Sequence, residues 1–334
     1  METSQNLESC RPVLRASRAS TGQLITVVVL LAALTAAAPK KADAAPGRST
    51  TIALTSDETR VVVVNRDANS LSIIQIKNKN GNDVSKKIAE IPVGEEPRCL
   101  AVSPDDRYAF VTNAISATVS VVNLAQNRVV KEIKVGTEPR GCALTANGSL
   151  LYVANHTEGT VSIIDTASRA VAGTVQVGGR PLAVAITDKG TGNISDDTVF
   201  VTEIFAELNA DFVDPNFDGN GEGRNLGKQG VVHAFPAGNA NPPITKITLK
   251  PLADSGFTAN RTSPNNFCNT TGTEQSLIFC PKPDLPADDP ANTMNPQGVY
   301  PNQLLSALIR GNRLYLPNIG PQPERTGARL QCGC

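Results

Sequence analysis

One unit of sequence occurs twice in succession and recurs in part on either side. Its opening phrase, Val-Gly, appears at Val93, Val135 and Val177, so the copies follow one another at a fixed interval of 42 residues. A period of about 40 residues that divides into short strands is typical of propeller blades. We therefore predict an all-β fold, a β-propeller of four-stranded antiparallel blades.

Alternating apolar residues and turn signals divide each copy into four strands. In the copy that starts at Val135, the predicted strands are 140–145, 150–155, 160–165 and 170–176. Asn147-Gly148 favours a hairpin turn between the first two. The strands consist almost entirely of Val, Ile, Leu and Ala, as expected when both faces of a blade are buried against its neighbours.

The copies also predict the domain organisation. We place blades at about residues 49–92, 93–134, 135–176 and 177–250 and part of a fifth at 299–318, which makes about four and a half blades. Two long insertions, 203–229 and 251–298, interrupt the pattern. Glu203 stands where the two preceding copies have Asn113 and Asn155.

The repeat resembles the YVTN family of β-propeller proteins. The matching phrases are Phe110-Val-Thr-Asn113 and Tyr152-Val-Ala-Asn155, each followed by Thr-Val-Ser, together with Val-Gly-x-x-Pro and Ser103-Pro-Asp-Asp106. The chain has no Trp, which argues against the WD type of propeller. The resemblance implies a ring of about seven blades. We therefore interpret the chain as incomplete, and favour truncation over completion of the ring by another chain.

The first 44 residues are predicted to be a signal peptide. Three arginines precede an apolar run at 24–38, and the small-residue pattern Ala42-Asp43-Ala44 follows. The run is shorter than the roughly 20 residues that span a bilayer, and an uncleaved anchor is the alternative. We expect a mature propeller at 45–334 that is periplasmic, secreted or at the cell surface, without membrane attachment after cleavage.

The charge balance argues against a nucleic-acid partner. The 334 residues include 31 Lys and Arg against 31 Asp and Glu, and no basic run occurs in the blades. Phosphate backbones are bound through basic patches. The sequence also lacks a phosphate-binding glycine loop, a nucleophile motif and a catalytic triad, so it offers no positive sign of an enzyme.

The two insertions are predicted to share one face of the propeller. One joins the second and third strands of a blade, and the other joins the outer strand of one blade to the inner strand of the next. Loops of these two kinds lie on the same face of a propeller, so both insertions are expected at the same mouth of its central channel. Long loops on a rigid scaffold commonly carry function. We expect a protein partner or a small ligand at this top face.

The first insertion contains a candidate calcium site. Its alternating oxygen ligands, with Gly219 at the sixth place, are Asp214, Asn216, Asp218, Asn220 and Glu222. Such spacing lets a short loop surround a hard cation. The twelfth place holds Asn225 rather than a bidentate Glu, so this is not an EF-hand, and a polar turn-rich loop is the alternative.

Three arginines recur beside the prolines at which each blade begins. Arg98, Arg140 and Arg180 could surround the channel mouth and attract an anion. Glu95, Glu96 and Glu138 stand beside the first two, and local ion pairing is the favoured alternative.

The cysteines and histidines suggest structure more than chemistry. Cys268 and Cys280 flank a short polar loop, and we predict a disulfide between them in an oxidising compartment. Cys99 lies two residues after its repeat proline and Cys142 three after its own. This offset turns the side chains to opposite faces, so we predict two small core residues rather than a disulfide. His156 and His233 lack spaced partners, which argues against zinc.

Two functions follow from these observations, because a propeller alone does not define one. The first is an exported binding scaffold whose insertions recognise a partner. The alternative, implied by the resemblance, is the truncated propeller portion of a haem- or quinone-linked periplasmic oxidoreductase, with a c-type haem protein as candidate partner. The chain itself lacks the Cys-x-x-Cys-His haem-attachment motif. A surface-layer component is a third option.

Overall fold

The computed structural model describes residues 50–209, 227–252 and 301–317, and the backbone of 257–261 and 277–281. The chain divides into two compact units, 1–43 and 44–334, and the described residues all belong to the second. The predicted signal peptide, the calcium loop 214–222 and Cys268 lie outside the described residues.

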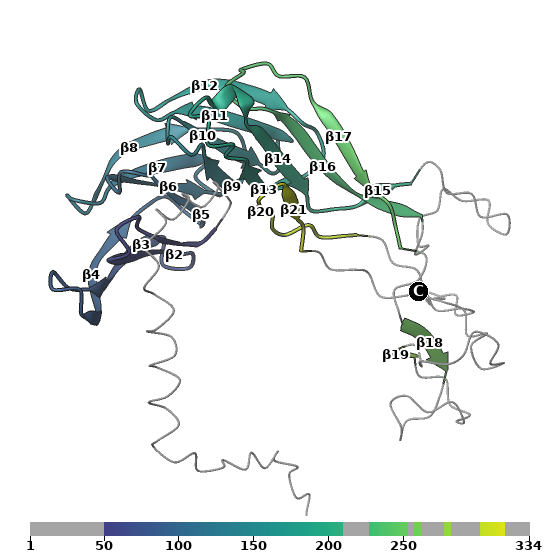
Figure 1. The fold of residues 1–334 in the computed structure, drawn as a ribbon, viewed down its shortest axis with the longest axis horizontal. Coiled ribbons are helices and arrows are strands. Elements are labelled where there is room, and N and C mark those ends of the chain that lie inside the picture. The colour runs from purple at the N-terminus through teal and green to yellow at the C-terminus, as the bar shows by residue number, and fades with distance from the viewer. Residues whose placement is uncertain (1–49, 210–226, 253–256, 262–276, 282–300, 318–334) are drawn as a thin grey trace, which may run out of the picture. The chain divides into compact units, whose positions relative to one another are not determined.

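The first three blades are regular antiparallel sheets of four strands (Figure 1). The first contains β1 (Ile52–Leu54), β2 (Arg60–Asn65), β3 (Ser70–Lys77) and β4 (Asp83–Pro92). The second contains β5 (Pro97–Val102), β6 (Tyr108–Asn113), β7 (Thr118–Asn123) and β8 (Arg128–Lys134). The third contains β9 (Pro139–Leu144), β10 (Leu150–Asn155), β11 (Thr160–Asp165) and β12 (Ala170–Gln176). Each sheet follows chain order, as hairpin-connected strands do.

The fourth blade has the same plan with an extra strand. Its sheet consists of β13 (Pro181–Ile186), β14 (Thr198–Glu203), β16 (Lys228–Pro236), β17 (Thr245–Leu249) and the short β15 (Glu207–Leu208). A 3₁₀ turn, η1 (Ile194–Asp196), precedes β14. Two hairpins follow: β18 (Phe257–Arg261) with β19 (Leu277–Pro281), and β20 (Leu308–Arg310) with β21 (Arg313–Tyr315). The β18–β19 hairpin falls in an insertion for which we predicted no strands.

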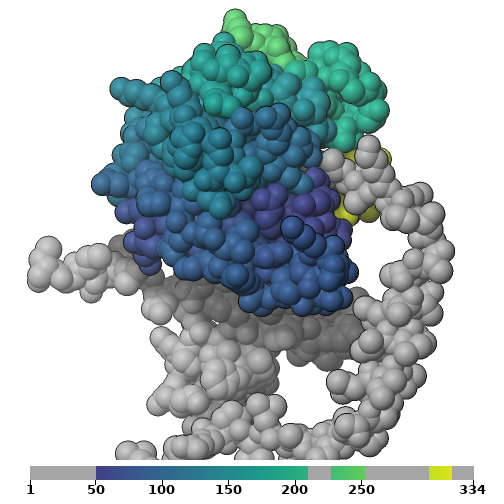
Figure 2. Space-filling model, turned by 90° about the vertical axis from the view of Figure 1, so that its left-hand side faces the viewer, coloured from purple at the N-terminus to yellow at the C-terminus, as the bar shows by residue number. Residues whose placement is uncertain are grey.

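The core lies between successive blades. Among the described residues, four apolar clusters each combine side chains from two neighbouring sheets. Val62, Leu100 and Val111 belong to the cluster between the first two blades, and Phe110, Leu144 and Val153 to the next. Figure 2 shows the blades, coloured purple to teal, forming a continuous surface. These sheets confirm the predicted all-β propeller of four-stranded antiparallel blades, and both blade faces are apolar because each packs against a neighbour.

The repeated glycine and asparagine have one structural explanation. Asn113 is fully buried, and its Nδ2 donates to Thr118 Oγ1 at 3.0 Å and Ser120 Oγ at 2.8 Å. A Cβ atom added at Gly94 would come within 2.7 Å of Asn113 Cγ. Only glycine therefore lets the chain pass over the buried amide.

No helix in the described part of the chain is long and apolar enough to span a membrane.

Candidate functional site

Four arginines mark the edge at which consecutive blades begin. We call this set, Arg66, Arg98, Arg140 and Arg180, the arginine rim. Arg66 follows β2, and the other three stand beside the prolines that open β5, β9 and β13. Arg66 and Arg140 both lie within electrostatic reach of Arg98, and Arg140 and Arg180 within reach of His156. The rim therefore places four arginine side chains along one edge of the second unit, among carboxylates that pair with three of them.

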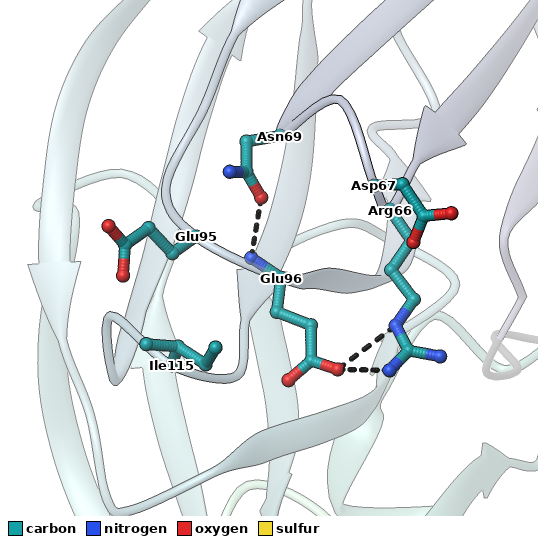
Figure 3. A pocket seen from close by; sticks show the side chains of 6 residues that line it. All are labelled: Arg66, Asp67, Asn69, Glu95, Glu96 and Ile115. Atoms are coloured by element: carbon teal, nitrogen blue, oxygen red, sulfur yellow. Dashed lines mark hydrogen bonds and ion pairs between the residues drawn. The ribbon is translucent and has the colours of Figure 1, made fainter.

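Glu96 links the first two blades at this rim. Its Oε1 accepts from Arg66 Nε at 2.9 Å and from Arg98 Nη2 at 2.6 Å, and its backbone N donates to Asn69 Oδ1 at 2.8 Å. Figure 3 shows the Glu96 carboxylate directed toward Arg66, with that of Glu95 directed away. An open cavity of about 260 Å³ at this place is lined by Arg66, Asp67, Asn69, Glu95, Glu96 and Ile115.

Glu138 repeats the arrangement one blade later. Its Oε1 accepts from Arg140 Nε at 3.0 Å and Nη2 at 2.5 Å, and Oε2 accepts from Thr157 Oγ1. Burial alone would raise the pKa of Glu138, but the hydrogen bonds from Thr157 and Arg140 lower it overall. Glu138 is therefore held as a carboxylate that positions the Arg140 guanidinium.

The backbone at these two glutamates is unusual. Glu96 and Glu138 have φ angles of +54° and +57°, in the left-handed region that non-glycine residues seldom adopt. Their carbonyls accept from the backbone N of Ala114 and of His156, both at 2.9 Å. The strained residues thus fasten the start of each blade to the end of its own second strand.

Arg180 differs from the other members of the rim. It precedes its proline and so occupies the place that Glu96 and Glu138 hold in the earlier copies. It is exposed, and no carboxylate among the described residues forms an ion pair with it. Arg180 is therefore the member of the rim that has no ion-paired carboxylate within the described residues.

His156 lies between the third and fourth blades beside this charge. It is 5% exposed, and its Nδ1 is 3.0 Å from the Pro181 carbonyl oxygen. Burial lowers the pKa of His156; the Pro181 carbonyl and Glu138 oppose this, and Arg140 and Arg180 reinforce it. The neutral imidazole is thereby favoured, and Nδ1–H donates to the Pro181 carbonyl, whose oxygen can only accept.

The guanidinium of Arg98 is also partly withdrawn from water. Burial lowers its pKa, with Glu96 opposing and with Arg66 and Arg140 adding to the effect. Its Nε is buried and has no hydrogen-bond partner in the described part of the molecule. Arg98 retains an unused donor, which is uncommon for a buried polar atom.

The fourth blade carries a buried acid–imidazole pair. Glu203 Oε1 is 2.5 Å from His233 Nε2, and the side chains are 13% and 6% exposed. Glu203 occupies the place of Asn155, and His233 faces Val201 as Ser162 faces Val153. The pair therefore replaces the Asn155–Ser162 hydrogen bond of the third blade.

The sequence predicts part of this site. Arg98, Arg140 and Arg180 recur at fixed places in the repeat with local ion pairing as the favoured interpretation, and the first two form such pairs; anion binding stays a prediction. Arg66 and the Glu203–His233 pair are not predicted from the sequence. A usable signal existed: the residue after the repeat asparagine changes between copies, from Arg66 to Ala114 to His156.

The structure describes only some residues of the remaining predicted sites. Cys280 lies in β19, but Cys268 falls outside the described residues, so their disulfide stays a prediction. The calcium ligands 214–222 also fall outside. Within the residues that the structure describes, no group of three or more His, Cys, Asp or Glu side chains could hold a metal ion.

The fold defines a β-propeller protein, and comparisons with known proteins add a family likeness. A family model described as the cytochrome D1 haem domain matches residues 55–180. A search of curated proteins found no match. The YVTN resemblance is not confirmed by these comparisons.

Several solved structures resemble the chain. Hydrazine synthase of Kuenenia stuttgartiensis shares 19% identity at a TM-score of 0.38, covering 67% of this chain and 74% of that one. The dihydro-haem d1 dehydrogenase NirN shares 12% at 0.41, covering 60% and 38%. A 6-phosphogluconolactonase-like protein of Bacteroides uniformis shares 15% at 0.44, covering 61% and 56%. The chain thus spans little more than a third of NirN.

Proposed function

We propose that this chain is the propeller part of a haem-linked oxidoreductase exported to the periplasm, and that the arginine rim with His156 receives a haem bearing carboxylates. The observation that carries this proposal is the match of residues 55–180 to the cytochrome D1 haem domain, since this segment contains the whole rim and His156. The match supports this function better than the pure binding scaffold that the sequence alone favours.

The donor set at the rim fits such a group. Haem iron is held by neutral imidazole nitrogen in many proteins. The contact of His156 Nδ1 with the Pro181 carbonyl leaves Nε2 as the basic nitrogen, as in histidines that bind metals. Guanidinium groups suit haem carboxylates because they present paired donors. Among the described residues, no carboxylate forms an ion pair with Arg180, which therefore offers such a group.

The chain's own residues would have distinct tasks. A bound haem supplies one-electron chemistry, which the protein side chains lack. His156 would present a neutral nitrogen, because burial and the neighbouring arginines disfavour its protonation. Glu96 and Glu138 hold Arg98 and Arg140 in place, and Arg140 and Arg180 would bind and orient the carboxylates.

The test is a spectroscopic titration of the purified exported chain with ferric haem. We expect a saturable Soret shift, which His156→Gln would change in position because the imidazole nitrogen that would hold the iron is lost. Arg140→Gln and Arg180→Gln should each weaken binding roughly tenfold, the loss expected for a charged hydrogen bond. Arg128→Gln, an exposed arginine on the outer strand β8, is the matched control.

Two results would count against the haem proposal. One is a Soret change that never saturates, and the other is saturable binding that His156→Gln leaves unaltered. If neither the wild type nor the control binds haem while the chain captures a protein partner, the binding scaffold is the better function.

A further inference from the structure

Two buried thiols meet between the second and third blades. Cys99 lies in β5 and Cys142 in β9, and the two side chains are 2% and 0% exposed. Their Sγ atoms are 2.7 Å apart, and the backbone N of Cys142 donates to Cys99 Sγ at 3.0 Å. Both belong to the apolar cluster that these two blades share.

This contact corrects one of the expectations from the sequence. The prediction that both cysteines are core residues is confirmed, but the argument that opposite faces keep them apart is wrong. Cys99 is paired with Thr112 and Cys142 with Val153, one and two residues before the repeat asparagine. The cysteines therefore lie on opposite faces of their own sheets.

Where two blades stack, one face of the first sheet packs against the opposite face of the next sheet. Cys99 and Ala101 point toward the third blade, while Leu100, between them, packs toward the first. Cys142 and Leu144 point toward the second blade, while Ala143 packs toward the fourth. Because one face of each blade packs against the other face of the next, the offset of one residue brings the two sulfurs together.

We propose that Cys99 and Cys142 form a disulfide that joins the second and third blades. A disulfide has its sulfurs about 2.05 Å apart, so closing this contact requires a movement of less than about 1 Å. The residues come from neighbouring strands in different sheets, which lets the bond cross a blade interface. This proposal is independent of the proposed haem function.

The bond forms by thiol–disulfide exchange with a protein or small-molecule disulfide donor. The thiolate of one cysteine attacks the donor's S–S bond and forms a mixed disulfide, releasing one donor thiol. The second cysteine attacks the mixed disulfide and releases the other donor thiol. The two cysteines are oxidised, the donor is reduced, and the two thiol protons end on the donor sulfurs.

Exchange must precede the closing of the interface. Burial raises the pKa of the Cys142 thiol, and the neighbouring Cys99 sulfur adds to this, so the folded pair reacts slowly. The bond closes a loop from Cys99 to Cys142 that contains β6, β7 and β8. Such a closure restricts the unfolded chain and stabilises the folded one.

The experiment refolds the full chain with oxidised glutathione and maps its peptides without reduction. We expect a cross-linked peptide containing Cys99 and Cys142, and no labelling of either thiol after denaturation. The melting temperature should exceed that of the reduced protein by about 5–15 °C. In Cys99→Ala and Cys142→Ala this peptide is lost and the remaining cysteine is labelled.

The control separates this bond from the predicted Cys268–Cys280 disulfide. Cys268→Ser should retain the Cys99–Cys142 peptide and most of the melting shift. Quantitative labelling of both Cys99 and Cys142 in the refolded, oxidised wild type would overturn the proposal. So would a cross-link in which either residue is joined only to a different cysteine. Because the peptide mapping uses the wild type, it remains decisive even if a variant fails to fold.

Discussion

Glu203 Oε1 lies 2.5 Å from His233 Nε2, in the place where the third blade joins Asn155 to Ser162. The fourth blade thus keeps the positions of the paired residues and replaces an amide–hydroxyl hydrogen bond by a carboxylate–imidazole contact. The Nδ1 of His233 is buried and has no hydrogen-bond partner in the described part of the molecule. The pair depends on both members, because either one alone leaves a buried polar group unsatisfied.

This dependence gives the first prediction. Glu203→Ala and His233→Ala should each lower the free energy of unfolding by about 1–3 kcal/mol. The double change Glu203→Asn and His233→Ser should recover most of the loss, because it restores the pair of the third blade. Denaturant unfolding measures these values. Glu207→Gln, which breaks a partly exposed pair with Lys246, should cost no more than about 1 kcal/mol.

A result in which the double variant is less stable than both single variants would contradict the proposed equivalence of the two pairs. It would mean that the site in the fourth blade has been rebuilt beyond these two residues.

The second prediction concerns the repeat glycine. Gly94→Ala should destabilise the protein by about 1–3 kcal/mol, because the new Cβ would meet the buried Asn113 side chain at 2.7 Å. The exposed neighbour serves as control, and Glu95→Ala should stay within about 0.5 kcal/mol of the wild type. If denaturant unfolding shows Gly94→Ala and Glu95→Ala to be equally stable, the Asn113 side chain can move aside to admit a Cβ atom at position 94.

The third prediction is a pH dependence carried by His156. Because burial lowers its pKa in the folded protein, the unfolded chain binds the proton more readily. The contribution of His156 to stability is therefore present above the ordinary pKa of about 6.5. It falls as the pH drops from there toward the lowered pKa.

The corresponding measurement compares the wild type with His156→Gln in denaturant unfolding at a series of pH values. The variant should lose less stability than the wild type across this range. Identical pH profiles would show that His156 does not carry the effect. The conservative variant keeps a donor for the Pro181 carbonyl, so lost packing is not confused with lost titration.

The fourth prediction tests a contact between the third and fourth blades. Tyr152 is fully buried, packs near Phe235, and its hydroxyl accepts from the backbone N of Gly238 at 2.8 Å. Tyr152→Phe should cost about 1 kcal/mol, because the N–H loses its acceptor while the ring stays in place. The exposed Tyr315→Phe is the control and should change stability by less than about 0.5 kcal/mol. If Tyr152→Phe and Tyr315→Phe change the free energy of unfolding equally, the hydrogen bond to the Tyr152 hydroxyl does not stabilise this interface.

Local periodicity was enough to predict much of the fold. The strands predicted at 150–155, 160–165 and 170–176 coincide with β10, β11 and β12, and the first strand of that blade begins one residue earlier than expected. These features follow from alternation and turn chemistry, which depend on neighbours along the chain. The hairpin β18–β19 carried no such repeat signal and was not predicted.

Alternation and turn chemistry along the chain therefore suffice to predict the blades, their order and the apolar character of both faces. Which faces meet is set by the folded propeller, which places Cys99 against Cys142 across two sheets, Glu203 against His233, and Arg98 beside Arg66. Alternation along a strand separates its two faces but does not specify what covers each one. That assignment depends on how successive sheets stack, and stacking is a property of the assembled propeller.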